Sequence, residues 1–75
     1  MEELIDRIVI DPGVLVGKPV IKGTRIPVYL IVEFLANGVT EKEILKEYPT
    51  LKQEDIRAAL LYASKCINGE ETIIL

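Results

Sequence analysis

The chain has 75 residues, a net charge of −3 and 49% hydrophobic residues, which fits one small folded domain. It has no histidine and a single cysteine, Cys66, so no internal disulfide and no Cys/His zinc site can form, and we expect no metal or cofactor. A domain of this size buries only about 60% of the surface that its unfolded chain exposes. We therefore expect a partner subunit to support the fold, most simply in a homodimer.

Neither a secretory signal nor a membrane span is predicted. Residues 1–3 (Met-Glu-Glu) are not the basic head that precedes the apolar core of a signal peptide. The longest apolar stretch, residues 28–36, is interrupted by Glu33 and is far shorter than the ~20 residues of a membrane helix. These features predict a cytoplasmic protein that does not enter a membrane.

The first third of the chain is predicted to form short strands and turns. Residues 4–10 are rich in isoleucine and valine, which favour a strand, and residues 11–13 (Asp-Pro-Gly) are typical of a turn. Two glycines and two prolines between residues 17 and 28 exclude a long regular element there. We expect a short strand over 19–22 and a tight turn at 23–24.

A first helix is predicted over residues 27–37. Pro27 favours a helix start because the amide hydrogen that proline lacks is not needed there, and the Asn-Gly pair at 37–38 is a typical helix end. The residues between are apolar on nearly every side, so this helix is expected to be buried on most sides.

A second helix is predicted over residues 41–48. Thr40 and Glu43 have the spacing of a capping box, in which each side chain binds the backbone amide of the other residue. Pro49 ends the helix, because the residue before a proline avoids helical geometry.

A third helix is predicted to begin between residues 51 and 53 and to end near 67. Its core face is expected to contain the apolar residues that recur at helical spacing, Ile56, Leu60, Ala63 and Ile67. The predicted fold is thus a single, mainly α domain. Short strands and turns occupy 1–26, a three-helix helix-turn-helix bundle occupies 27–68, and an apolar tail occupies 69–75.

The sequence predicts a protein that is not an enzyme. General acid–base and nucleophilic catalysis need a suitable base, acid or nucleophile within hydrogen-bond reach of one another. The chain has no histidine, no serine or cysteine beside a base, and acids only at positions typical of helix caps and surfaces. No catalytic residue is therefore predicted.

Three groups of residues are candidates for binding. Lys18, Lys22 and Arg25 form the one basic stretch without an acid, which favours contact with phosphate or an acidic partner. The alternative is that the glycines there only permit turns and the cations are solvated.

If the last two helices form a DNA-reading helix-turn-helix, the residues facing bases are Lys52, Gln53, Asp55 and Arg57. A plain three-helix bundle without DNA is the alternative. A dimer or partner face is predicted from Ala58, Leu61, Tyr62, Ile73, Ile74 and Leu75, with ordinary scattered exposure as the alternative.

Several of these segments resemble the domain-of-unknown-function family DUF433. The block over residues 17–28, Gly-Lys-Pro-Val-Ile-Lys-Gly-Thr-Arg-Ile-Pro-Val, is the most specific part of the resemblance, which spans roughly residues 5–65. The resemblance implies a homeodomain-like fold, a bacterial or archaeal source, and a VapB-type antitoxin encoded beside a PIN-like ribonuclease toxin. The other matching segments are 11–13, 44–45, 48–49, 54–60 and 62–63.

One departure affects the third helix. The family commonly has Thr or Ser followed by Pro where this chain has Lys52-Gln53, so Thr50 with Gln53 is a substitute cap that would start the helix earlier. The leading hypothesis is an antitoxin that binds operator DNA as a dimer and neutralises the PIN-like toxin, whose metal-binding site is acidic. Arg25 or Lys22 would plug that site. The alternative is a protein-interaction module without DNA binding, suggested by the acidic pI.

Overall fold

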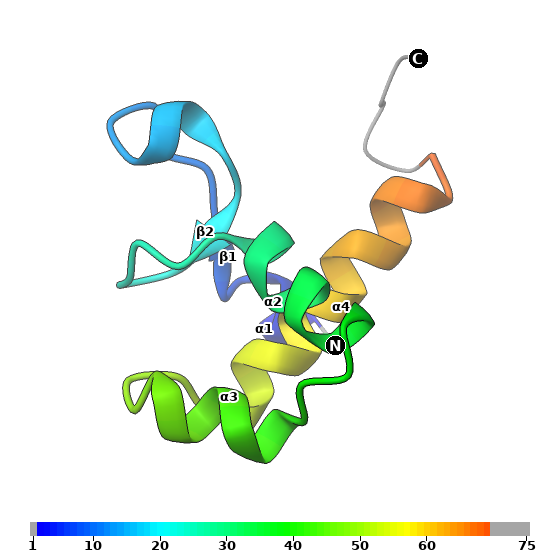
Figure 1. Cartoon of the computed structure of the whole chain (residues 1–75). Coiled ribbons are helices and arrows are strands. Elements are labelled where there is room, and N and C mark those ends of the chain that lie inside the picture. Colours follow the sequence, from blue (N-terminus) through cyan, green and yellow to red (C-terminus); the bar gives the residue numbers. More distant parts are fainter. Residues whose placement is uncertain (1, 70–75) are drawn as a thin grey trace.

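The structure is a computed structural model that describes residues 2–69, with side chains from residue 4 onward. Figure 1 shows a mainly helical chain with a small two-stranded antiparallel sheet near the N-terminus, which confirms the predicted fold class. The elements are, in chain order, α1 (Glu2–Ile5), β1 (Ile8–Val9), the short 3-10 segment η1 (Leu15–Gly17), β2 (Val20–Ile21), α2 (Val28–Ala36), α3 (Glu41–Glu47) and α4 (Gln53–Ile67).

The sheet is shorter than the sequence suggests. Ile8 pairs with Ile21 and Val9 with Val20, in antiparallel register. The strand predicted over 4–10 is wrong in its first half, because residues 2–5 form one helical turn, α1, that packs on α4. An apolar run of this length can cover a helix as well as it can extend a sheet, and here α4 supplies the surface.

The other side of β2 holds the segment that leads into α2. The amide of Ile21 donates to the carbonyl of Ile26 at 3.0 Å, and the amide of Val28 donates to the carbonyl of Pro19 at 2.9 Å. These bonds fix the entry into α2, so that Pro27 precedes the helix as its cap instead of occupying its first turn.

Helix α3 begins at the predicted capping box. The amide of Glu43 donates to Thr40 Oγ1 at 3.1 Å, and the amide of Thr40 donates to Glu43 Oε1 at 2.9 Å. The helix ends at Glu47, one residue before the predicted end, because Tyr48 has left helical geometry ahead of Pro49.

Helix α4 contacts α1, β1, α2 and α3, and it supplies the centre of the core through Ile56 and Ala59, both 0% exposed. The predicted core face of this helix is wrong for Leu60 and Ile67, which are 42% and 84% exposed. The second half of α4 extends beyond the other helices in Figure 1, so its apolar residues have little to pack against. The core consists of Ile21, Val28, Ile31, Ile44, Leu51, Ile56 and Ala59.

Among residues 2–69, no helix is both long enough and apolar enough to cross a membrane. Among the side chains described, those of residues 4–69, histidine, cysteine, aspartate and glutamate do not gather in any group that could hold a metal ion. The tail residues Ile73, Ile74 and Leu75, predicted as part of a partner face, lie outside the described residues.

Candidate interaction surfaces

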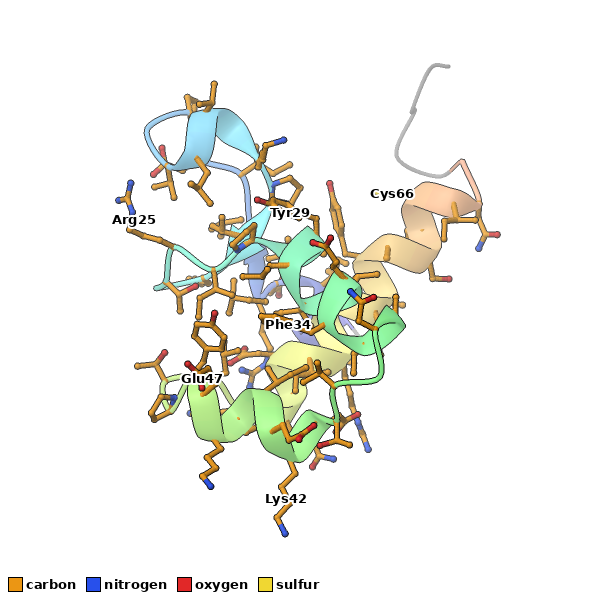
Figure 2. All side chains as sticks on the ribbon, viewed as in Figure 1. Arg25, Tyr29, Phe34, Lys42, Glu47 and Cys66 are labelled. Atoms are coloured by element: carbon orange, nitrogen blue, oxygen red, sulfur yellow. The ribbon has the colours of Figure 1, made fainter. Side chains whose placement is uncertain are left out.

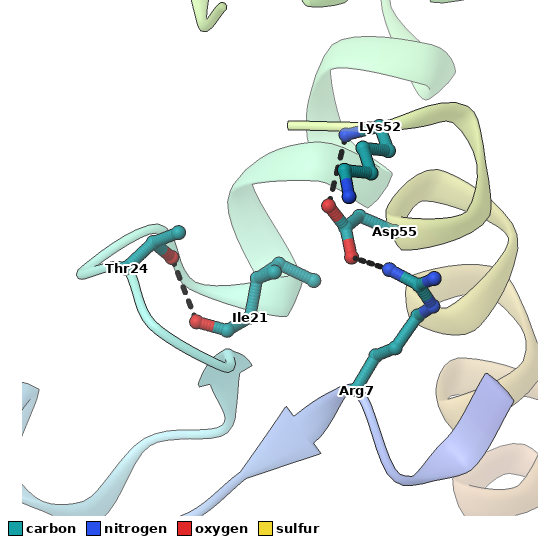
Figure 3. Close-up of polar contacts among 5 residues, drawn as sticks. All are labelled: Arg7, Ile21, Thr24, Lys52 and Asp55. Carbon is teal, nitrogen blue, oxygen red and sulfur yellow. Dashed lines mark hydrogen bonds and ion pairs between the residues drawn. The ribbon is translucent and has the colours of Figure 1, made fainter. Parts of the chain in front are cut away.

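The start of α4 is built around a buried carboxylate, shown in Figure 3. Asp55 is only 6% exposed; its Oδ2 accepts from the amide of Lys52 and its Oδ1 from Arg7 Nη1, each at 2.9 Å. A lysine side chain has no acceptor with which to cap a helix, so Asp55 supplies the capping bond. Thr50 is not the cap, and the helix begins at Gln53.

Asp55 is therefore unsuited to the DNA-reading role predicted for it. Both carboxylate oxygens are occupied inside the protein, and the side chain is almost fully buried. The prediction failed because the partner, Arg7, is 48 residues away in the sequence. No local pattern indicates that this acid faces inward.

The other three predicted DNA-facing residues are exposed: Lys52 directly precedes α4, and Gln53 and Arg57 lie on its first two turns. Gln53 Nε2 donates to Glu41 Oε1 of α3 at 3.3 Å, which links the two helices across their turn. Exposed Glu54 stands beside them, so this face carries charges of both signs.

The first turn of α3 adds further negative charge through Glu41 and Glu43. The amide of Thr40 donates to the Glu43 carboxylate, and with the Thr40 hydroxyl it lowers the pKa of Glu43 below its ordinary value of 4.5. This carboxylate therefore stays ionised at neutral pH, where it would repel a nearby phosphate.

A compact turn carries two of the three predicted basic residues. Thr24 holds it together: its Oγ1 donates to the carbonyl of Ile21 at 2.8 Å (Figure 3) and accepts from the amide of Ile26 at 3.0 Å. Gly23 completes the reversal at a φ of +81°, which glycine adopts without strain. These bonds fix the backbone that carries Lys22 and Arg25.

Both cations of this turn point to solvent. Lys22 and Arg25 are exposed, and neither forms an ion pair with a carboxylate among the side chains of residues 4–69. In Figure 2, Arg25 extends away from the helices, on the side of the small sheet. We refer to residues 22–25 as the basic turn.

The structure separates Lys18 from the basic turn. Its Nζ lies 5.6 Å from the centre of the Tyr29 ring at the start of α2, within the range of a cation–π contact. The predicted basic trio is thus divided between two surfaces, because β2 and the turn that follows it lie between Lys18 and Arg25.

Lys18 borders an apolar groove between α2 and the second half of α4. The groove has a volume of about 570 Å³. The prediction that the first long helix is buried on most sides is wrong: only Val28 and Ile31 of α2 are buried, and Tyr29 is 56% exposed. A chain of this size has no further layer to cover that side. The groove is lined by Lys18, Pro19, Val28, Tyr29, Val32, Glu33, Ala36, Tyr62, Ala63 and Cys66.

The predicted partner face on the third helix is only partly accessible. Tyr62 lines the groove and Leu61 is half-buried, but Ala58 is 0% exposed and packs inside the protein. Ala58 directly precedes core residue Ala59, and both turn toward the elements that surround α4. Ala58 therefore cannot contact a partner while the chain keeps this fold.

The loop before β2 is left-handed, which its sequence does not predict. Leu15, Val16 and Gly17 have φ angles of +50°, +57° and +81° in succession. The amide of Gly17 donates to the carbonyl of Val14 at 3.1 Å, so Leu15 and Val16 take the two central positions of a tight turn. Positive φ is a strained conformation for leucine and valine, so the residue types at 15 and 16 do not signal it.

The chain belongs to the family described as "Protein of unknown function (DUF433)", whose profile matches residues 8–63. It also resembles a crystal structure of a DUF433 member from Anabaena variabilis, with a TM-score of 0.75 and 40% sequence identity. That similarity covers 93% of this chain and 67% of the Anabaena chain. The resemblance inferred from the sequence blocks is thereby confirmed.

Two uncharacterized proteins are similar in sequence. Protein y4eO of Sinorhizobium fredii is 42% identical over 53 residues, which are 71% of this chain and 24% of that protein. The present chain therefore spans about a quarter of the length of that relative. An Archaeoglobus fulgidus protein is 71% identical over 24 residues, or 32% of this chain and 67% of that protein.

Proposed function

We propose that this chain is an antitoxin-type regulatory protein that binds an acidic protein partner through its basic turn. The partner is a PIN-like ribonuclease encoded beside it, the class implied by the family resemblance. The observation that supports the proposal is the fixed turn that presents Lys22 and Arg25 to solvent without a carboxylate partner among the described residues.

The charges favour such a partner. A nuclease site that binds metal through carboxylates is strongly negative, and a guanidinium can bind a carboxylate through two parallel hydrogen bonds. Because the Thr24 bonds already fix the backbone of this turn, little backbone freedom is lost when Arg25 enters such a site. The chain itself supplies no catalytic group in this account, and it acts by covering the partner's site.

The test is binding between this chain and the purified product of the adjacent gene. Reversing one charge with Arg25→Glu is expected to weaken binding by at least about tenfold, because like charges would then face each other. Lys46→Glu is the matched control, since it makes the same charge change at an exposed position on α3. Equal binding by the wild type and Arg25→Glu would refute the proposal, as would no binding by the wild type.

DNA binding is a second candidate, supported by the exposure of Lys52, Gln53 and Arg57 at the start of α4. The turn before this helix is anchored by Leu51, which is 5% exposed, so the helix has a fixed position against α3. If Lys52 and Arg57 each contact one phosphate, the logarithm of the DNA-binding constant should fall by about 1.8 for each log unit of salt concentration. Lys52→Ala should reduce that slope by about half on the chain's own promoter DNA. If the chain does not bind its promoter DNA, the DNA-binding candidate is refuted, and the alternative of a protein-interaction module without DNA binding remains.

We further propose that the groove between α2 and α4 is closed by a second copy of the chain. Lys18 and Glu33 line it with opposite charges, so a two-fold dimer that pairs Lys18 of one copy with Glu33 of the other would be complementary in charge. The small side chains of Ala36 and Ala63 allow two helices to approach closely. Sedimentation at low micromolar concentration should give a dimer, and Ala63→Glu should shift it to monomer. A monomeric wild type would contradict this assembly.

A further inference from the structure

The loop that ends at η1 combines two unusual features at Val16. This side chain is 93% exposed, the highest value among the exposed large hydrophobic residues, and its backbone has a φ of +57° and a ψ of +39°. A single exposed apolar side chain is common on protein surfaces. A β-branched residue in left-handed geometry is a true outlier, because its Cβ substituents crowd the backbone.

The loop is fixed by its own hydrogen bonds, so the strain is built in. Gly13 and Val14 bond back to Asp11 at 2.9 Å and 2.8 Å, and the amide of Lys18 donates to the carbonyl of Leu15 at 3.2 Å. A Cβ at Gly17 would lie 4.0 Å from the Cα of Pro12, so the two sides of the loop are close at its base. Such a framework holds a left-handed residue in place whatever its side chain.

Turns with two positive φ angles at their centre strongly prefer Asn-Gly or Asp-Gly. Here the central pair is Leu15-Val16. Because Val16 is almost fully exposed, its methyl groups gain next to nothing from packing within residues 2–69. The strain of this residue is thus not offset by any contact described within the chain. Strained backbone that persists in this way is concentrated at functional sites.

We propose that Val16 is an apolar anchor that inserts into a recess of the acidic protein partner, beside the surface bound by the basic turn. This inference rests on the proposed function and adds a second contact to it. Figure 1 shows the loop and the basic turn projecting on the side of the sheet, away from the C-terminal half of α4. The partner surface must therefore combine an acidic site with a neighbouring apolar recess that takes one branched side chain.

Three substitutions distinguish the apolar contact made by the Val16 side chain from the strain of its backbone. Val16→Ile keeps both the apolar branch and the left-handed strain. Val16→Thr keeps the branched shape and the strain but replaces a methyl with a hydroxyl. Val16→Asn removes the apolar surface and relieves the strain, because asparagine tolerates left-handed geometry.

The first measurement is thermal unfolding of the free chain, which needs no partner. The Tm of Val16→Asn should rise by about 4–8 °C over the wild type, and that of Val16→Thr should stay within about 2 °C. An unchanged or lower Tm for Val16→Asn would show that the valine is not strained, and it would overturn the inference.

The second measurement is affinity for the purified product of the adjacent gene. Val16→Asn and Val16→Thr should each bind at least about tenfold more weakly, and Val16→Ile should bind as the wild type does. If the wild type binds and Val16→Asn binds equally well, the anchor is refuted and the basic turn remains. If the wild type does not bind, the proposed function fails and the anchor fails with it.

Discussion

Replacing Asp55 with alanine should destabilise the protein more than replacing Glu54, the other acid of α4. The substitution removes the capping acceptor of the Lys52 amide, and loss of such a cap costs about 1 kcal/mol. It also removes the ion pair with Arg7, whose side chain is 35% exposed, so we assign that loss only about 1 kcal/mol. The total of about 2 kcal/mol corresponds to a Tm lower by about 8–16 °C in a chain of this size.

The assay is urea unfolding followed by circular dichroism, with Glu54→Ala as the matched control. Glu54 is the neighbouring acid in the same first turn, but it is exposed and bonds to no described group. Its loss removes only a helix-dipole contribution of about 0.3–0.5 kcal/mol. A double-mutant cycle with Arg7→Ala should return a coupling of about 1 kcal/mol between Arg7 and Asp55. Equal effects of the two acid substitutions, or no coupling, would show that Asp55 neither caps α4 nor pairs with Arg7.

Other substitutions test the remaining features. Thr40→Ala should raise the pKa of Glu43 toward 4.5, as measured by NMR titration. In the wild type the lowered pKa of Glu43 stabilises the fold at pH values above 4.5, and this stabilisation should disappear as the pH falls through the pKa of the folded protein. Gly23→Ala should cost about 1 kcal/mol of unfolding free energy from its φ of +81° alone, since no atom lies within 4 Å of the added Cβ. Ile31→Ala should cost about 2–5 kcal/mol and Ile67→Ala less than about 0.5 kcal/mol, because they are 0% and 84% exposed. Similar losses for the two isoleucines in chemical unfolding would contradict the packing described.

The three long helices could be predicted from the sequence because their limits are set locally. The Thr40–Glu43 capping box depends on residues three apart, and it formed as predicted. The end of α2 before Gly38, which has a φ of +88°, likewise depends on one residue type that tolerates left-handed geometry. Such signals do not depend on tertiary packing, so they survive in the folded protein.

The site could be predicted only in part, because burial depends on residues distant in sequence. Lys22 and Arg25 were expected to be accessible, and they are. Asp55 was misplaced because its partner Arg7 lies in the β1 region, and the exposed side of α2 was missed because periodicity cannot show how many layers surround a helix. The left-handed Val16 contradicts the preferences of its residue type, so no propensity argument would find it.

The position of α4 as the last described helix has a consequence during translation. Ile56 and Ala59 complete the core that Ile21 and Ile31 begin, so a ribosome must synthesise more than half of the chain before those earlier isoleucines can be covered. Until then the nascent chain exposes the apolar residues of α2, in a state open to aggregation or chaperone capture. Premature termination upstream of Ile56 would therefore leave a fragment unable to close its core, and such a fragment should be a substrate for cellular proteases.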